Sequence, residues 1–223
     1  MKTDINSEKF SKAFELFIAI VLGLTAVLTA YASWQGSLYG GIQAQNYTEG
    51  NATLADGNER YNAASQLIMQ DMQTWNEISS LRVDQAFAES AGETDEVSRI
   101  QYKLDYLMYN NVSPDLEAAI AWADEQTDYA SPFEMEGYVD SYYVDANTVL
   151  DSGYAKITAG NEANGHGDKQ GLVTVIFAVV LFMLGIVSTF NNMRTKFVVT
   201  GISIVALVYG IITMLTIPMV TLG

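Results

Sequence analysis

Residues Leu16 to Ala32 read LFIAIVLGLTAVLTAYA and carry no charged side chain. A helix needs about 20 apolar residues to cross a bilayer, and this run is close to that length. Two more uncharged runs follow late in the chain, from Gly171 to Phe190 and from Phe197 to Gly223. Together the three runs predict an all-α integral membrane protein with three transmembrane helices.

The three predicted spans divide the chain into six segments. We expect a cytoplasmic N-terminus at 1–13, a first span at 14–33, an acidic extracytoplasmic helical domain at 34–170, a second span at 171–190, a cytoplasmic loop at 191–196, and a third span with a short outer C-terminus at 197–223.

Basic residues near the span ends predict the orientation. Five lie on the side of the N-terminus and the short loop: Lys2, Lys9, Lys12, Arg194 and Lys196. Only Lys156 and Lys169 lie near the membrane on the other side. The positive-inside rule therefore places the N-terminus in the cytoplasm of a multi-pass plasma-membrane protein, with the central segment and the C-terminus outside. Tyr31, Trp34 and Tyr39 then lie at the outer headgroup level, where aromatic rings are enriched.

The first span also has features of a signal peptide. A basic leader, an apolar stretch and Ala30-Tyr31-Ala32 resemble a cleavable signal with small residues at the cleavage site. The apolar stretch is longer than a usual signal core, which favours retention as a span. Cleavage is the alternative interpretation.

Composition excludes several kinds of chemistry. The chain has no cysteine and one histidine, so disulfides, thiol catalysis and a multi-histidine metal site within one chain are excluded. Residues 33–169 hold 23 acidic and six basic side chains, a net charge of −17. Such a surface repels nucleic acid, so we expect no nucleic-acid partner. No phosphate-binding, dinucleotide-binding or zinc-hydrolase motif appears, so we expect no cofactor and no enzyme activity.

The central segment has helical periodicity. Apolar residues recur at spacings of three, four and seven from Leu54 to Ile78, which predicts a helix that continues outward from the first span. Glycines disfavour helix, so we expect a break near Gly40-Gly41, with a flexible loop from Gly36 to Gly57 as the alternative.

Further helices are predicted by their start signals. One begins after Gly92, and another at Ser113-Pro114, where serine caps and proline suits the first turn. Ser131-Pro132 is a similar start. A helix returning to the membrane begins at Val139, and we expect four glycines to interrupt it: Gly160, Gly165, Gly167 and Gly171.

Small residues recur along two of the predicted spans at helical spacing. They allow helices to approach closely, which predicts helix-packing interfaces within or between subunits. The first span carries one such stripe and the third span carries the other: Ala19, Gly23, Ala26, Ala30; Ser203, Ala206, Gly210, Thr213.

Two polar clusters are candidate metal sites. Glu162, His166 and Asp168 lie together in sequence, but structural and catalytic metal sites need three or four placed ligands, so an exposed histidine in a glycine-rich hinge is favoured. The acidic residues around Asp124 lack the order of a calcium-binding loop, so solvated surface is favoured there. We therefore expect no metal site.

The layout resembles a loosely defined group of uncharacterised prokaryotic three-span membrane proteins with a helical extracytoplasmic domain. The resemblance lies in the Trp34-Gln35-Gly36 region after the first span, the Ser131 to Met135 turn and the closing pair of spans. It implies the architecture and adds no catalytic residue.

Two functional hypotheses follow. The first is a non-enzymatic membrane scaffold or binding protein that self-associates through its small-residue stripes and presents its acidic domain to an extracytoplasmic protein partner. The alternative is an oligomeric cation-permeable channel with an acidic outer vestibule, its lumen lined by serine, threonine and glycine. Under both hypotheses the partners are membrane lipid and further copies of the chain.

Overall fold

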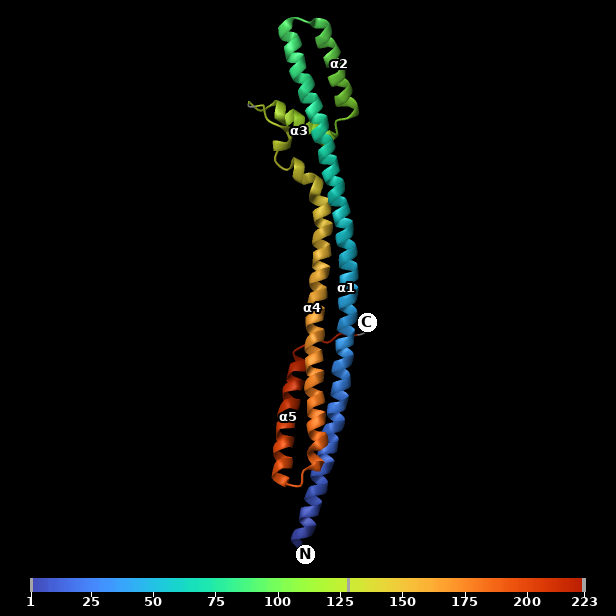
Figure 1. Cartoon of the computed structure of the whole chain (residues 1–223), viewed down its shortest axis with the longest axis vertical. Coiled ribbons are helices and arrows are strands. Elements are labelled where there is room, and N and C mark those ends of the chain that lie inside the picture. The colour runs from blue at the N-terminus through green and yellow to red at the C-terminus, as the bar shows by residue number, and fades with distance from the viewer. Residues whose placement is uncertain (1, 128, 222–223) are drawn as a thin grey trace. The chain divides into compact units, whose positions relative to one another are not determined.

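The computed structural model describes residues 2–127 and 129–221, with side chains from residue 10 onward (Figure 1). Every regular element in those ranges is a helix, which confirms the all-α prediction. Five are α-helices and two are short 3₁₀ helices: α1 (Lys2–Ala91), α2 (Thr94–Asn110), α3 (Pro114–Asp124), η1 (Pro132–Glu134), α4 (Tyr138–Ile186), η2 (Val187–Thr189) and α5 (Met193–Leu215).

The chain forms two compact units. The first, here called the three-helix unit, comprises residues 1–49 and 155–223 and contains parts of α1 and α4 with all of α5. The second, the insert unit, comprises residues 50–154 and contains the rest of α1 and α4 with α2, α3 and η1. Both long helices therefore contribute to both units.

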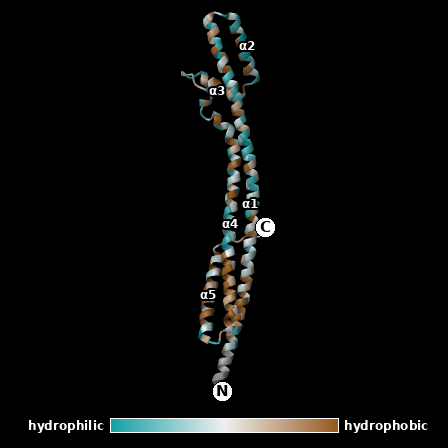
Figure 2. Ribbon diagram, viewed as in Figure 1, coloured by the Kyte–Doolittle hydropathy of each residue, from teal (hydrophilic) through white to brown (hydrophobic). Residues whose placement is uncertain are grey.

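Three helices, α1, α4 and α5, are long and apolar enough to cross a membrane. Hydrophobic residues gather on all three within the three-helix unit, as the brown segments of Figure 2 show. The core of this unit comes largely from α4 and η2, whose most deeply buried side chains are Val173, Phe177, Val180, Leu184 and Val187. Apolar side chains also cover the outside of the unit, as at Ile20, Val179 and Val205.

The buried residues of α1 include a series that recurs every seven positions. In the three-helix unit this series is Ile18, Thr25, Ala32 and Tyr39, and in the insert unit it is Gly57, Ala64, Asp71 and Ile78. Other residues three or four positions away are also buried, namely Gln35, Ile68 and Thr74. Helix α4 has a series of the same period at Ala163, Gln170, Phe177 and Leu184. A seven-residue period with intervening spacings of three and four is typical of helices that pack as a coiled coil.

Helices α1 and α4 are antiparallel within each unit. In the three-helix unit Gly36 lies against Gly167, whereas Tyr47 lies against Gly160. In the insert unit the contacts are reciprocal, because Gly57 lies against Leu150 while Gly153 lies against Leu54. The residue numbers rise along α1 as they fall along α4.

The expected glycine breaks are wrong. Helix α1 runs unbroken through Gly36, Gly40 and Gly41, so residues 36–57 are not a loop. Helix α4 likewise continues through its glycines at 160, 165, 167 and 171. Glycine costs a helix about 1 kcal/mol relative to alanine. Part of that cost is offset here because several glycines let the partner helix approach closely. An added Cβ at Gly160, for example, would lie 2.6 Å from the Tyr47 ring.

The insert unit closes around a small apolar core. Its buried members come from α1, α2, α3 and α4: Ile78, Ala88, Ile100, Leu104, Leu107, Leu116, Ala119, Ile120 and Tyr138. The predicted start of α3 is confirmed, since the Ser113 hydroxyl accepts from the backbone N–H of Leu116 at 3.1 Å with Pro114 in the first turn. The start at Ser131 produces only the 3₁₀ turn η1, whereas α4 begins a few residues later at Tyr138.

Candidate functional site

The small-residue stripe on α5 packs inside the chain. Ser203 and Gly210 are buried, and Ala206 and Thr213 are half-buried. A Cβ added at Gly210 would lie 2.5 Å from Cε1 of Phe177 on α4. This stripe therefore serves the close contact between α5 and α4 within one protomer.

The stripe on α1 has a different environment. Ala19, Gly23, Ala26 and Ala30 are all exposed, and a Cβ added at Gly23 would meet nothing within 4 Å. The buried face of α1 lies elsewhere, at Ile18, Thr25 and Ala32. The four small residues thus form a face of α1 that the described part of the chain leaves uncovered. We call it the α1 small-residue face.

A buried glutamine binds the segment after α5. The side chain of Gln35 is 1% exposed, and its amide nitrogen donates to the carbonyl of Val220 at 3.1 Å. Its amide oxygen accepts from the N–H of the same residue at 2.9 Å. The Tyr39 hydroxyl donates to the carbonyl of Pro218 at 2.6 Å, and Ile217 between α5 and Pro218 is buried. Two polar side chains of α1 therefore fix the segment in place through its backbone.

His166 lies beside this cluster rather than in an exposed hinge. The imidazole is half-buried and lies against the Tyr39 ring, with 5.1 Å between the ring centroids. Its Nδ1 atom and the Oε1 atom of Gln170, one helical turn away, are buried without a hydrogen-bond partner in the described structure. The expectation of an exposed histidine is wrong because α4 is continuous there and turns this face toward α1. Among the described residues, no three His, Asp or Glu side chains gather as a metal would require.

The insert unit contains a buried carboxylate. Asp71 on α1 is 5% exposed, and one of its oxygens accepts from the hydroxyls of Tyr138 at 2.7 Å and Tyr142 at 2.6 Å. Burial raises the pKa of both phenols, and their hydrogen bonds to Asp71 raise it further. A buried charge is tolerated only with such partners, so this cluster is a structural one that joins α1 to α4.

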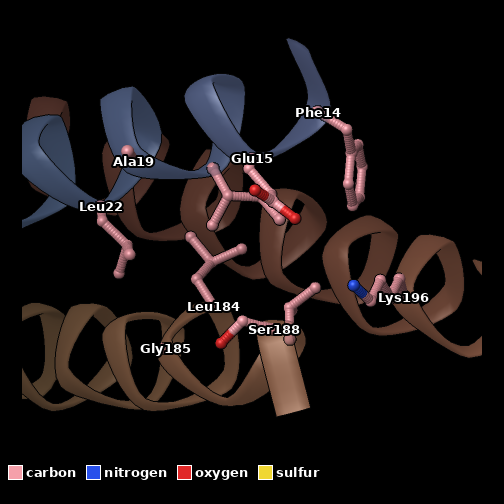
Figure 3. A pocket seen from close by; sticks show the side chains of 10 residues that line it. Phe14, Glu15, Ala19, Leu22, Leu184, Gly185, Ser188 and Lys196 are labelled. Atoms are coloured by element: carbon pink, nitrogen blue, oxygen red, sulfur yellow. The ribbon is translucent and has the colours of Figure 1, made fainter. Parts of the chain in front are cut away.

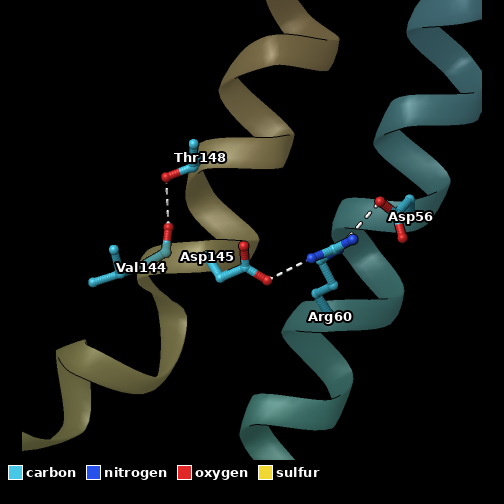
Figure 4. Close-up of polar contacts among 5 residues, drawn as sticks. All are labelled: Asp56, Arg60, Val144, Asp145 and Thr148. Atoms are coloured by element: carbon cyan, nitrogen blue, oxygen red, sulfur yellow. Dashed lines mark hydrogen bonds and ion pairs between the residues drawn. The ribbon is translucent and has the colours of Figure 1, made fainter.

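Ion pairs join the helices at the surface. Arg60 of α1 donates to Asp56 on its own helix at 3.1 Å and to Asp145 of α4 at 2.6 Å (Figure 4). Both carboxylates raise the pKa of the guanidinium, Asp145 the more strongly. Lys156 pairs similarly with Glu49 in the three-helix unit, where its ammonium lowers the pKa of that carboxyl.

The acidic cluster near the end of α3 is not uniformly solvated. Arg82 of α1 donates to both oxygens of Asp124, at 2.6 Å and 3.0 Å. The same guanidinium lies 5.5 Å from the centre of the Trp75 ring. Sequence reasoning favoured solvated surface at Asp124, whereas in the structure this carboxylate pairs with Arg82. The signal for this contact was weak because 42 residues separate Arg82 from Asp124.

Comparisons of the chain with protein-family models, with curated proteins and with solved structures find no match.

Proposed function

We propose that the chain is a multi-pass plasma-membrane protein whose N-terminus is cytoplasmic and whose acidic insert unit lies outside. Three apolar helices support membrane insertion, and the five-to-two distribution of basic residues supports this orientation. A cysteine introduced at Asn110, which is exposed, tests the orientation. It should react with an impermeant reagent in intact cells, and labelling only after the cytoplasm is opened would refute the orientation.

We further propose that the protein is a non-enzymatic scaffold or binding protein that self-associates through the α1 small-residue face. The observation that carries this proposal is the contrast between the two stripes. The stripe on α5 is covered within the protomer, but the α1 stripe is exposed along its whole length. Membrane helices associate through such small-residue faces because lipid provides little hydrophobic drive for association. The acidic insert unit would then present several copies of one surface to an extracytoplasmic protein.

The alternative, an oligomeric cation-permeable channel, needs polar side chains that face a lumen. Three buried hydroxyl residues of the apolar helices are Thr25, Thr200 and Ser203. Thr25 and Ser203 donate to backbone carbonyls of their own helix, at 2.7 Å and 2.8 Å. These contacts favour the scaffold, since hydroxyls buried within one protomer are withdrawn from a lumen between protomers.

The test compares three leucine substitutions at glycine. Gly23→Leu adds bulk to the α1 small-residue face and should lower the number of subunits per particle, measured by mass photometry in detergent, without lowering protomer stability. Gly210→Leu should instead destabilise the protomer, because Phe177 occupies the space. Gly201→Leu is the control, since Gly201 is exposed on α5 with open space around it. A monomeric wild-type chain, or unchanged assembly in Gly23→Leu, would refute self-association through this face.

A further inference from the structure

A cavity of about 270 Å³ lies in the three-helix unit where α1 passes the C-terminal end of α4. Figure 3 shows its lining side chains. It exists because two facing positions have little or no side chain, Ala19 on α1 and Gly185 on α4. A Cβ at Gly185 would meet nothing within 4 Å, so the space is open on that side. This cavity is separate from the polar cluster around Gln35.

The walls of the cavity are apolar and its polar groups are few. Ile18, Leu22 and Leu184 supply apolar wall, whereas Glu15, Ser188 and Lys196 supply the polar groups. Figure 3 shows the Glu15 carboxylate on α1, the Ser188 hydroxyl below it and the Lys196 ammonium to the right, on three different sides of the view. No ion pair joins Glu15 to Lys196 in the described part of the chain. The Glu15 carboxylate accepts one long hydrogen bond, from the Ser11 hydroxyl at 3.5 Å to Oε1, which leaves its other oxygen for a ligand group of opposite charge.

We propose that this cavity binds one phospholipid of the cytoplasmic leaflet whose headgroup carries a primary amine. The Lys196 ammonium pairs with the lipid phosphate, the Glu15 carboxylate accepts from the lipid ammonium, and the start of one acyl chain lies against the apolar wall. Drug-sized ligands occupy about 300–1,000 Å³, so a smaller cavity takes the headgroup end of a lipid and leaves the remaining tail in the bilayer. The site rests on the membrane insertion proposed above.

The charges distinguish this lipid from the other common headgroups. An anionic glycerol headgroup matches Lys196 but places no cation beside Glu15. A choline headgroup carries a positive charge without an N–H, so it cannot donate a hydrogen bond to the carboxylate. A hydrogen bond to a charged group corresponds to a preference of about tenfold or more for the amine headgroup.

The experiment uses the full chain purified in detergent and exposed to equal amounts of phosphatidylethanolamine, phosphatidylglycerol and phosphatidylcholine. Native mass spectrometry measures the lipid retained per protomer. We expect the wild type to retain phosphatidylethanolamine preferentially. Gly185→Leu should reduce retention of all three lipids, because its side chain enters the cavity. Glu15→Gln should remove the preference for the amine while phosphate binding persists.

The control is Gly201→Leu, an equal change at an exposed glycine that does not line the cavity, and it should retain lipid as the wild type does. Equal retention of the three lipids by the wild type, or unchanged retention in Gly185→Leu, would overturn the site. Alkaline carbonate extraction of membranes separates the two proposals. Release of the wild-type chain refutes insertion and the site together, whereas an inserted chain without lipid preference refutes the site alone.

Discussion

Gly153→Ala should destabilise the protein, although alanine is the better helix former. Gly153 is buried in the middle of α4, where an added Cβ would lie 2.8 Å from Cγ of Leu54 and 3.1 Å from its backbone nitrogen. Neither atom is the free end of a flexible side chain, so the two helices must separate. Overpacking of this kind costs about 1–3 kcal/mol, against a gain of about 1 kcal/mol from helix propensity.

The matched control is Gly165→Ala on the same helix. A Cβ there meets nothing within 4 Å, so only the propensity gain of up to about 1 kcal/mol remains. The free energies of unfolding of the two variants should therefore differ by about 2 kcal/mol, with opposite signs relative to the wild type. In a domain of 150–250 residues each kcal/mol shifts the midpoint of thermal unfolding by about 2–4 °C, which scanning calorimetry in detergent resolves.

A double variant tests the assigned cause. With Leu54→Ala in the background the Cγ atom is absent, so adding Gly153→Ala should cost much less than it does alone. Equal stabilisation by Gly153→Ala and Gly165→Ala would refute the close approach of α1 and α4 at this level. Additive effects in the double variant would instead refute Leu54 as the obstacle.

Three further predictions concern polar contacts. Gln35→Ala should remove both hydrogen bonds to Val220. Amide hydrogen exchange at Val220 should then become about tenfold faster, because a net hydrogen bond contributes about 1 kcal/mol. Unchanged protection of the Val220 amide would contradict the assigned contact. Raising the pH above the ordinary tyrosine pKa of about 10 should destabilise the insert unit, because the raised pKa values of Tyr138 and Tyr142 keep both protonated in the folded state while the unfolded phenols ionise. Tyr138→Phe should reduce this loss of stability at alkaline pH, as measured by denaturant titrations at several pH values. A variant whose stability depends on pH as the wild type does would contradict the role assigned to Tyr138. Asp124→Asn should change the free energy of unfolding by no more than about 1 kcal/mol, because the side chains of Asp124 and Arg82 are both more than a third exposed. A larger loss in the same titrations would indicate a role for Asp124 beyond this surface ion pair.

The sequence predicted the elements well because their signals are local. Uncharged runs revealed the apolar helices, and Ser113-Pro114 located the start of α3. It failed at the glycines because helix propensity describes an isolated helix. Whether Gly160 breaks a helix depends on what faces it, and its partner Tyr47 lies more than a hundred residues away in sequence.

The same limit applies to the candidate sites. The α1 and α5 stripes look alike in sequence, with small residues every three or four positions, and only packing shows that α5 buries its stripe while α1 exposes its own. The hydrogen bonds of Gln35 to Val220 join two residues that are 185 positions apart in sequence. They form between a side-chain amide and the backbone N–H and C=O of one residue, and no spacing pattern in a sequence predicts such a contact. The proposed lipid cavity forms where Ala19 on α1 faces Gly185 on α4. Predicting it requires knowing the register in which the two helices are aligned, and the sequence alone does not specify that register.

The buried carboxylate of Asp71 bears on that register. A seven-residue repeat of small and apolar side chains lets two antiparallel helices slide by one heptad and pack almost as well. A slip would move the hydroxyls of Tyr138 and Tyr142 about 10 Å along α1, since a helix rises about 1.5 Å per residue. Asp71 would then be a buried polar group without its two donors, and leaving such a group unsatisfied costs about 1–3 kcal/mol or more. One acidic side chain thus makes a single alignment of α1 and α4 the favoured one among otherwise similar alternatives.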